Sequence, residues 1–502
     1  MEHTVQALLH GQTYDALTSA VLHETAVSHL CCDSRKAQEG SFFFCLTGAA
    51  VDGHAYARSA YDKGARVFAV ERPVELPSDA VVIRFADTRE ALAHTSAAFY
   101  NYPHRRLKII GITGTKGKTT TALLIQSILS ASGISAGYIG TNGITYAGKQ
   151  FGTVNTTPES LELQKHLYDM AEAGVTAVVL EVSSQALWMH RVDGIAFDAC
   201  LFTNLSRDHV GGCEHPTFEH YKNSKKALFA VHEANAVFCN ADDPLAEDMV
   251  VDTDKKDRVV RVSLKDPACD WYASDVTPCR DSARLGVAFE CHRGDFVGKG
   301  YLGVPGTFNV SNALMAVAVC HDRFGVPPDA ALSYLGRTAV EGRFEPVYVP
   351  SMPDVTFLLD YAHNGVSLQA SLETLRGYRP ERLICLVGSV GERSFERRAQ
   401  LAEAAGRLAD YCIITSDNPG KEPPEQIINE MLAAFPADGC PRVSIADRAE
   451  AIAYAVKMAR AGDIVLLAGK GHEAYQLIGT ERVPFSEREI LLKAAALVGA
   501  TP

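Results

Sequence analysis

The sequence predicts an α/β protein of three domains, and its length, apolar runs and turn residues agree on this. At 502 residues the chain is long enough for about three domains, each with its own core. Short apolar runs with little alternation are separated by helical patterns, as in parallel sheets covered on both faces. We place the domains at residues 1–104, 105–339 and 340–502, with the first joint at the polar segment around Pro103.

The first domain is predicted to be a small α/β unit. Its strand candidates are three short apolar runs that lie between helical stretches, at residues 41–46, 66–70 and 80–84.

The second domain opens with the apolar strand 107–112, which a glycine-rich turn connects to a helix over 119–132. Gly133 follows that helix, as expected of a C-terminal stop. A second apolar run, 175–180, ends in Glu181. Strands of this kind with helices between them predict a parallel sheet.

The third domain repeats this rhythm more clearly. Its strand candidates are 355–359, 383–387, 411–415, 442–445 and 464–468, separated by helical patterns such as 399–408 and 449–460. Such βα units predict a second, Rossmann-like doubly wound sheet.

Composition excludes several classes of protein. With 48 Lys+Arg against 60 Asp+Glu, the net charge of −12 argues against a general binder of nucleic acid or of membrane surfaces. The chain has no apolar run of about 18 residues, so we expect no membrane insertion. The start lacks the pattern of a secretory signal, and the 13 cysteines include no Cys-x-x-Cys pair. We therefore expect reduced thiols and a cytoplasmic location.

The strongest motif is Gly-Thr-Lys-Gly-Lys-Thr-Thr at 114–120, between a strand and a helix. Backbone N–H groups of such a turn and the helix N-terminus form an anion cradle. Lys118 would reach the outer phosphates of a nucleotide, and the Thr119 hydroxyl is placed to bind Mg²⁺. The usual P-loop spacing is missed, since Gly111 is one residue too far and Gly114 two too near. The motif predicts nucleotide phosphate binding.

Other polar residues follow predicted strands. Glu181 ends one strand and His209 follows another, so both are candidates for the metal side of a nucleotide site. The turns at 417–420 and 469–473 follow strands of the third domain, on the edge where doubly wound sheets bind ligands. Lys225 alone is typical of a solvated helix face. The residues indicate an enzyme that uses ATP and Mg²⁺, and leave hydrolysis, kinase and ligase chemistry open.

Taken together, the motifs resemble the Mur ligases of peptidoglycan synthesis, relatives of folylpolyglutamate synthetase, and most of all the members that add the third residue of the peptide. The phosphate loop looks like that family's loop. The resemblance covers almost the whole chain, through the motifs at 33–35, 52–54, 155–157, 181–184, 191, 204–209, 240–243, 306–312, 342–343, 360–363, 417–419 and 469–473.

The resemblance implies a reaction and three domain roles. A carboxylate of UDP-MurNAc-L-Ala-D-Glu attacks the γ-phosphate of ATP to give an acyl phosphate, and the amine of a free diamino acid displaces phosphate. A uridine-binding domain, a central P-loop-type ATPase domain and a C-terminal amino-acid-binding domain are implied. The implied cofactors are ATP and Mg²⁺, and we expect a monomer.

The resemblance also implies roles for individual residues. Catalysis would use Lys118, Glu181, His209 and Lys225, with Thr119, Glu181, His209 and Lys225 (as a carbamate) on the metal side. ATP would contact Gly114, Thr115, Lys116, Gly117, Lys118, Thr119, Thr120, Asn309, Asn312, Arg343 and Asp360. The UDP-MurNAc-dipeptide would contact Ser34, Asn155, Thr156, Thr157, Ser183 and Arg191. The amino acid would contact Arg393, Asp417, Asn418, Gly420, Gly469 and Glu473.

One departure from the family pattern bears on the amino acid. Members that add meso-diaminopimelate carry Asp-Asn-Pro-Arg, whose arginine can pair with the distal carboxylate, whereas this chain has Gly420 at that position. We therefore predict L-lysine. The alternatives are L-ornithine, or meso-diaminopimelate held by Lys421 or Arg393 instead.

Two other classes compete with this reading. A folylpolyglutamate synthetase or another carboxylate–amine ligase is disfavoured by the uridine-type first domain. A catalytically inactive scaffold is disfavoured because the chain retains Lys118, Thr119, Glu181, His209 and Lys225 together.

Overall fold

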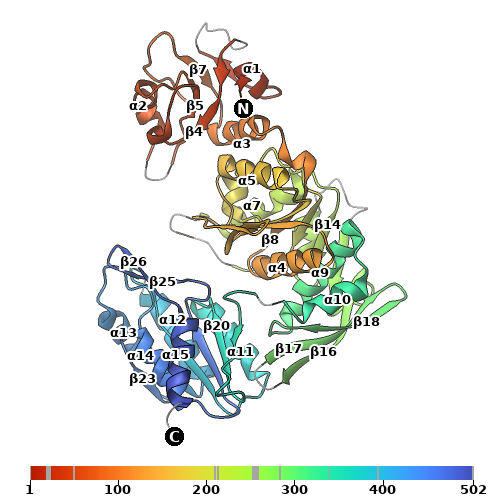
Figure 1. Ribbon diagram of the computed structural model, residues 1–502, viewed down its shortest axis with the longest axis vertical. Coiled ribbons are helices and arrows are strands. Elements are labelled where there is room, and N and C mark those ends of the chain that lie inside the picture. Colours follow the sequence, from red (N-terminus) through yellow and green to blue (C-terminus); the bar gives the residue numbers. More distant parts are fainter. Residues whose placement is uncertain are drawn as a thin grey trace. The chain divides into compact units, whose positions relative to one another are not determined.

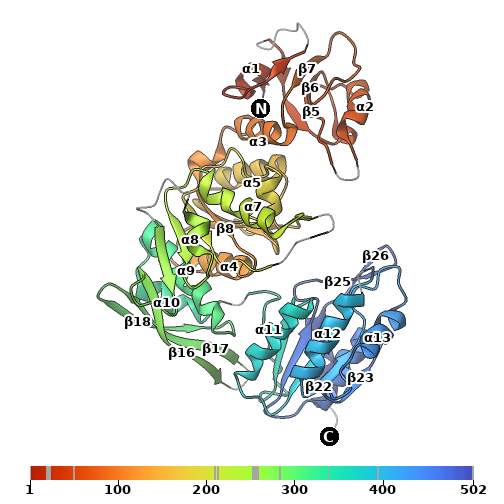
Figure 2. The same cartoon turned by 180° about the vertical axis from the view of Figure 1, so that it is seen from behind.

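The fold is α/β throughout, in a computed structural model that describes residues 2–17, 24–48, 51–207, 211, 214–251, 259–281, 284–338, 340–392 and 395–499. The chain forms two compact units: Met1–Trp271 with Met315–Val326, and Tyr272–Leu314 with Pro327–Pro502. Among the described residues, no helix is both long enough and apolar enough to cross a membrane. Figures 1 and 2 show the elements from two sides.

The first unit begins with a small sheet in the strand order β2-β7-β6-β5-β4, in which β4 to β7 run parallel. The three predicted runs are β5, β6 and β7. Its strands are β2 (Asp15–Ala16), β4 (His29–Cys31), β5 (Ser41–Phe44), β6 (Val67–Val70) and β7 (Val81–Arg84), beside the short pair β1 (His3–Thr4) and β3 (Ala26–Val27). Its helices are α1 (Val5–Leu8), α2 (Ala57–Asp62) and α3 (Thr88–Phe99).

The larger sheet of the first unit has the order β11-β10-β9-β12-β8-β13-β14-β15, parallel from β9 to β15. Its strands are β8 (Lys108–Thr113), β9 (Ala136–Gly140), β10 (Gly143–Tyr146), β11 (Lys149–Phe151), β12 (Ala177–Glu181), β13 (Ala199–Phe202), β14 (Val237–Asn240) and β15 (Val259–Ser263). The predicted strands before the glycine-rich turn and before Glu181 are β8 and β12. Both lie in the middle of the sheet, where helices cover both faces.

Helices lie on both faces of this sheet (Figure 1). One face packs against α5, α6, α7 and α8 through a continuous apolar cluster, and α4 lies on the other. The helices are α4 (Lys118–Ala131), α5 (Ser160–Glu172), α6 (Ser184–Trp188), α7 (Phe218–Ala230), α8 (Ala246–Val250) and α9 (Phe308–Phe324). The predicted helix after the phosphate loop is α4, which starts one residue earlier than expected.

The second unit contains an antiparallel ladder that the sequence did not predict. It consists of β16 (Trp271–Asp281), β17 (Arg284–Arg293) and β18 (Phe296–Leu302), with α10 (Pro328–Leu335) packed on β18. Polar and apolar residues do not alternate regularly in these strands, and few turn residues bound them, so the sequence gives no clear strand pattern here.

The other sheet of the second unit has the order β19-β20-β24-β21-β22-β23 and is parallel except for β19. All five predicted strands of this domain are present. The strands are β19 (Glu345–Val347), β20 (Thr356–Asp360), β21 (Leu383–Val387), β22 (Tyr411–Ile414), β23 (Arg442–Ser444) and β24 (Ile464–Ala468), and a hairpin joins β25 (Tyr475–Ile478) to β26 (Glu481–Pro484).

Two apolar clusters cover the two faces of this sheet. One includes residues of α11, α12 and α13, which lie in front in Figure 2, and the other includes residues of α14 and α15. The helices are α11 (Gly365–Arg376), α12 (Phe395–Leu408), α13 (Pro424–Ala433), α14 (Arg448–Met458) and α15 (Glu487–Gly499). The doubly wound arrangement predicted for the third domain is therefore present.

Candidate active site

The phosphate loop connects β8 to α4 and is held against the segment that follows β13. A Cβ on Gly114, at φ +149°, would lie 2.0 Å from Thr203 Oγ1, so only glycine fits there. The Thr115 amide donates to the Asn204 carbonyl at 2.8 Å, and the Lys116 amide donates to Asn204 Oδ1 at 3.0 Å. The loop is thus shaped before any ligand is bound.

Two lysines lie against this loop. Lys118 Nζ donates to the carbonyls of Gly114 and Thr115, at 2.9 and 3.1 Å. Lys225 Nζ donates to the Gly114 carbonyl at 2.8 Å, and its side chain is buried. Lys225 is therefore not a solvated helix residue, as the sequence alone would suggest, but part of the loop's surroundings. Two ammonium groups at one glycine-rich turn suit a polyanionic ligand.

A buried carboxylate stands at the end of β12, next to the loop. Glu181 Oε2 accepts from Thr119 Oγ1 at 3.0 Å and from Thr141 Oγ1 at 3.2 Å. Its Oε1 accepts from Tyr138 OH at 2.6 Å and from the Thr141 amide at 3.2 Å. The oxygens of Glu181, Thr119 and Thr141 form a set of hard donors, as Mg²⁺ prefers. The residues present therefore fit both the nucleotide and the cation that the sequence predicts.

Two of the hydroxyls that hold Glu181, those of Tyr138 and Thr141, were not found from the sequence. Tyr138 lies in β9, the strand that pairs with β12, and Thr141 directly follows it. Gly140 lies between them, and a Cβ there would come within 2.3 Å of Glu181 Oε1. A tyrosine, a glycine and a threonine closing a parallel strand beside the metal-side carboxylate were the available signal.

A chain of contacts leads from Glu181 to the segment 155–159. Thr157 Oγ1 donates to the Glu181 carbonyl at 2.8 Å and accepts from the Ser183 amide at 3.1 Å. Arg191 donates to the Thr157 carbonyl at 3.1 Å and pairs with Glu159 at 2.7 Å. Four of the residues predicted for the UDP-MurNAc-dipeptide are joined here: Thr156, Thr157, Ser183 and Arg191. Asn155 is the neighbouring residue, whose carbonyl accepts from Thr153 Oγ1.

Ser34 lies in the turn that follows β4 of the small N-terminal sheet. Ser34 is buried, and its carbonyl accepts from Lys63 Nζ at 3.0 Å. Burial, and then the charge of Glu159, raise the pKa of the Cys32 thiol, which lies two residues before Ser34 in the chain.

In the second unit, Arg343 and Asp360 lie together. Asp360 Oδ1 accepts from the Phe344 amide at 3.1 Å, and its Oδ2 accepts from Ser371 Oγ at 2.8 Å. Burial raises the pKa of Asp360, although the Arg343 charge opposes this. The Arg343 guanidinium lies 5.1 Å from the centre of the Tyr361 ring.

Asn309 and Asn312 form a separate pair on α9. Asn312 Nδ2 donates to Asn309 Oδ1 at 2.9 Å, and Asn309 Nδ2 donates to the Pro305 carbonyl at 2.6 Å. Within the described residues, no hydrogen bond joins this pair to Arg343 or Asp360. The predicted nucleotide residues of this unit therefore form two clusters.

The predicted amino-acid residues converge on a lysine that the sequence interpretation left out. Lys470 Nζ donates to Asn418 Oδ1 at 2.9 Å and lies 3.2 Å from Glu473 Oε2 and 3.4 Å from Asp417 Oδ1. Its side chain is 0% exposed. Asn418 Nδ2 also donates to Glu473 Oε2 at 2.8 Å. The signal was present in the sequence, since Lys470 stands between two glycines after a buried strand.

This cluster holds both signs of charge. Two carboxylates and one ammonium, with an amide between them, match the zwitterionic head of an amino acid. A Cβ on Gly469, at φ +117°, would lie 2.7 Å from Asp417 Oδ2, so a side chain there would displace the carboxylate. Gly420 has φ +59°, with nothing within 4 Å of the position its Cβ would occupy.

Tyr361 connects the Arg343 pair with the amino-acid cluster. Burial and then the Glu473 charge raise the pKa of Tyr361, while Arg343 lowers it. The ring lies 5.1 Å from that of His472, and the Tyr361 amide donates to the Gly342 carbonyl. The two groups of predicted ligands within this unit are therefore adjacent.

Two predicted residues, His209 and Arg393, lie outside the described residues. Their predicted roles are unaffected by the contacts above.

Comparison with known families gives three matches along the chain. Residues 26–100 match the catalytic domain of the Mur ligase family, residues 112–320 the Mur ligase middle domain, and residues 342–471 the glutamate ligase domain of Mur ligases.

Whole-chain comparison finds relatives named UDP-N-acetylmuramoyl-L-alanyl-D-glutamate–2,6-diaminopimelate ligase. The one from Clostridium perfringens is 36% identical over 97% of this chain and 98% of its own. The one from Geobacillus kaustophilus is 38% identical over 91% and 92%. A solved structure of a ligase with the same name has a TM-score of 0.73 at 28% identity and covers 100% of both chains. The MurF ligase of Thermotoga maritima, solved with ADP, shares the fold with a TM-score of 0.59 at 19% identity, over 94% and 97% of the chains.

Proposed function

Because the chain belongs to the Mur ligase family, we propose that it is an ATP-dependent ligase that adds the third amino acid to UDP-MurNAc-L-Ala-D-Glu. The observation that carries this proposal is the similarity, over 97% of the chain, to a ligase named for that substrate. The three predicted domains, 1–104, 105–339 and 340–502, take the uridine, ATP and amino-acid roles. The enzyme works as a monomer in the cytoplasm, where its nucleotide substrates are made.

The phosphate loop and Glu181 supply the nucleotide end of the site. Lys118 and the amides of 114–120 hold the phosphates and offset the negative charge that builds up during phosphoryl transfer. Thr119 and Glu181, with His209, hold Mg²⁺, which would screen the phosphate oxygens when bound. The hydrogen bonds from Tyr138 and Thr141 keep the Glu181 oxygens pointed at this place. Because the site is already ordered, an incoming carboxylate can approach the γ-phosphate without the free-energy cost of orienting these side chains.

Lys225 is proposed to act as a carbamate. Loss of a proton from the buried ammonium would give the neutral amine. Addition of CO₂ to that amine, with release of a second proton to water, would give an anionic oxygen ligand on the metal side. Its position beside the Gly114 carbonyl supports this role. Lys225→Ala should abolish phosphate release, and added bicarbonate should not restore it. Unaltered turnover would exclude the role.

The remaining ligands divide between the two units. Ser34, Asn155, Thr156, Thr157, Ser183 and Arg191 are proposed to bind the UDP-MurNAc-dipeptide. Asn309, Asn312, Arg343 and Asp360, in the second unit, are proposed to contact ATP. Arg393, Asp417, Asn418, Gly420, Gly469 and Glu473, joined by Lys470, are proposed to bind the amino acid.

The comparisons favour meso-diaminopimelate over L-lysine, which the sequence interpretation preferred. Relatives from three genera, 36–38% identical to this chain, carry diaminopimelate in their names. The preference for L-lysine rested on Gly420, which removes a guanidinium from the site. We propose meso-diaminopimelate as the substrate, with its distal carboxylate held by another cation.

Lys421 is the nearest candidate in the sequence for that cation. It is exposed and follows Gly420 directly, at a turn whose glycine amide donates to the Leu477 carbonyl. Lys421→Ala should raise the KM for meso-diaminopimelate and leave that for ATP unchanged. If KM for the amino acid does not move, Arg393 becomes the remaining proposed partner, and Arg393→Ala tests it.

The decisive experiment measures phosphate release from ATP with Mg²⁺ and UDP-MurNAc-L-Ala-D-Glu. Turnover is compared with meso-diaminopimelate, L-lysine and L-ornithine as the third substrate. Strong turnover with meso-diaminopimelate alone supports both parts of the proposal. Preference for L-lysine would support the proposed ligase activity but not meso-diaminopimelate as its substrate, and would indicate that Gly420 sets the specificity. Absence of turnover with all three would refute the proposed function.

A further inference from the structure

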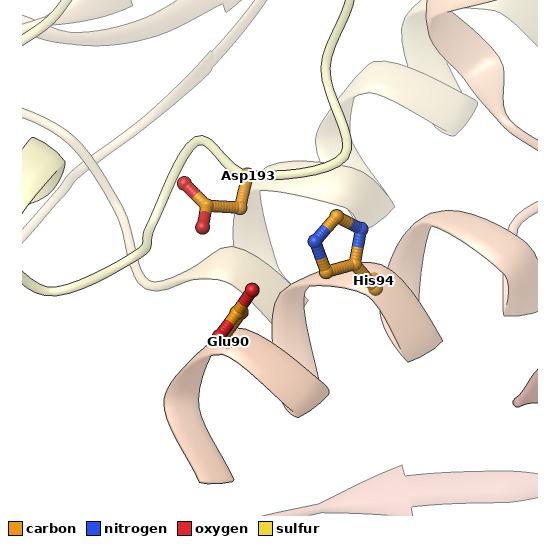
Figure 3. Close-up of side chains that lie close together, drawn as sticks. All are labelled: Glu90, His94 and Asp193. Atoms are coloured by element: carbon orange, nitrogen blue, oxygen red, sulfur yellow. The ribbon is translucent and has the colours of Figure 1, made fainter. Parts of the chain in front are cut away.

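A second polar cluster lies where α3 meets the turn after α6. Glu90 and His94 are one helical turn apart on α3, and Asp193 lies in the turn that follows α6. One ligand atom from each of the three lies within 4.8 Å of the other two. Figure 3 shows the three side chains on facing elements, with the Glu90 carboxylate directed toward the His94 ring. The mechanism proposed above uses none of these residues.

The spacing of these atoms is too wide for direct contact and suits an ion between them. In the part of the chain that the structure describes, His94 makes no hydrogen bond or ion pair. Zinc–nitrogen and zinc–oxygen bonds are about 2.0–2.2 Å long, so tetrahedral ligands lie roughly 3.4 Å apart. Glu90 is exposed and has a long side chain, so it can close the difference at little cost.

The carboxylate of Asp193 is oriented by two further histidines. His190 Nδ1 lies 2.7 Å from Asp193 Oδ2, and His232 Nε2 lies 3.7 Å from Oδ1. The contact with His190 is a hydrogen bond, of the kind typical of a ligating carboxylate at a metal site, whereas the contact with His232 is a longer electrostatic one. The hydrogen bond holds Oδ2 of Asp193 in place.

The close approach of α3 and the turn after α6 depends on the backbone of both elements. Gly194, at φ +74°, faces α3, and a Cβ there would lie 3.1 Å from Ala97 Cβ and 3.5 Å from His94 Nδ1. Asp87 caps α3 by accepting from the amides of Arg89 and Glu90. The approach of helix and turn is therefore fixed by residues other than the three ligands.

We propose that Glu90, His94 and Asp193 form a divalent metal site that takes zinc or a similar borderline cation, with water as the fourth ligand. One imidazole and two carboxylates suit Zn²⁺ better than Mg²⁺, which prefers oxygen ligands alone. The ion joins α3, which covers the first sheet, to the turn that carries Arg191. It therefore clamps the small N-terminal sheet to the body of the first unit.

The chain contains a matched control for this site. Glu162 and His166 have the same spacing on α5, and the same degrees of exposure as Glu90 and His94. Among the described residues, no third ligand atom of a His, Cys, Asp or Glu side chain forms a comparable cluster with them. Glu162→Gln and His166→Ala therefore change a Glu-x₃-His pair without touching the proposed site.

The test uses the full chain, stripped of metal and kept in excess Mg²⁺ so that oxygen-only sites are filled. Co²⁺ is titrated while its visible absorption is followed, and Zn²⁺ is then used to displace it. We expect intense bands of a four- or five-coordinate ion in the wild type and in both controls. Glu90→Gln, His94→Ala and Asp193→Asn should weaken binding at least ~10-fold, as loss of supporting groups at metal sites already does.

A thermal readout separates a clamp from a surface ion. Zn²⁺ should raise the unfolding temperature of the wild type and of both controls, but not that of Glu90→Gln. Because Glu90 is exposed, this variant keeps the fold even if Asp193→Asn does not. Equal Co²⁺ spectra in Glu90→Gln, His94→Ala and the wild type would overturn the proposal. The absence of Co²⁺ bands in a folded wild type would overturn it as well.

Discussion

Lys470 offers the sharpest test of how the amino-acid cluster is built. Its ammonium is fully buried and lies within 3.4 Å of Asp417 Oδ1 and 3.2 Å of Glu473 Oε2. Lys470→Met keeps most of the volume and removes the charge, which leaves two carboxylates in the interior without their cation. Removing one partner of a buried ion pair costs about 3–5 kcal/mol. Glu473 is 18% exposed and keeps its hydrogen bond from Asn418, so we expect the lower end, about 3 kcal/mol.

Hydrogen exchange measures this cost locally. At about 1.4 kcal/mol per factor of ten, exchange of the β24 and β21 amides should accelerate roughly 100-fold. Peptides of β8 and β12, in the other unit, serve as the internal reference. Lys457→Met is the matched control, because Lys457 is an exposed lysine on α14 of the same unit and should cost less than about 0.5 kcal/mol.

Two outcomes would refute the reasoning. If β24 exchange in Lys470→Met stays within about threefold of the wild type, the buried carboxylates do not depend on this ammonium. If Lys457→Met accelerates exchange as much, the effect belongs to loss of any lysine. The same variant should raise the KM for the amino acid and leave that for UDP-MurNAc-dipeptide unchanged.

Three further predictions concern the first unit. Gly140→Ala places a Cβ 2.3 Å from Glu181 Oε1 and should lower phosphate release by ~100-fold with the fold intact by circular dichroism, since ångström-scale misplacement costs that much; activity within twofold of wild type would contradict this. Arg191→Lys removes one of two contacts, to Thr157 and Glu159, and should raise the KM for the UDP substrate by about 10-fold, measured by initial rates, with ATP as the control. Asp198→Asn breaks the Arg323 pair and should cost about 2 kcal/mol at pH 7 in urea unfolding followed by tryptophan fluorescence. Burial raises the pKa of the Asp198 carboxyl, but the hydrogen bond from Arg323 outweighs burial and holds that pKa below its ordinary value of 3.8. The pair therefore contributes its full stability above pH 3.8, and the difference between variant and wild type should be lost as the pH falls from 3.8 through the lowered pKa. A difference that stays constant down to pH 3 would contradict the assignment.

The sequence was most informative where one feature of the chain decides the structure alone. The parallel strands β8, β12, β21 and β24 are unbroken apolar runs, and such runs are buried whatever surrounds them. The glycine-rich loop correctly predicted the helix α4 that follows it. The ladder β16–β18 was missed because its strands carry mixed polar and apolar residues, so their pairing depends on partners that are distant in the sequence.

Side-chain partnership was harder to predict than the positions themselves. The sequence around Lys225 is typical of a solvated helix face, yet its ammonium donates to the carbonyl of Gly114, 111 residues away. Lys470 was passed over because its partners, Asp417 and Asn418, are more than 50 residues earlier. No sequence motif marks the cluster of Glu90, His94 and Asp193, because Asp193 is about 100 residues after His94 and comes close to α3 only in the folded chain. Local spacing cannot reveal contacts that the sheet order creates.

The two units share one way of placing a carboxylate, and this supplies a signal that local spacing lacks. Glu181 ends β12 and Asp417 follows β22, both at the carboxyl edge of a parallel sheet. In each case a glycine near the end of another parallel strand leaves the space that the carboxylate occupies. A Cβ would lie 2.3 Å from Glu181 Oε1 at Gly140 and 2.7 Å from Asp417 Oδ2 at Gly469. Each carboxylate is also held by a donor that directly follows that glycine, Thr141 for one and Lys470 for the other. A sequence in which a buried parallel strand ends in a glycine followed by a hydrogen-bond donor therefore predicts a carboxylate on another strand beside that glycine. The hydrogen bonds that orient this carboxylate come from the fold itself, so they are part of a preorganised site.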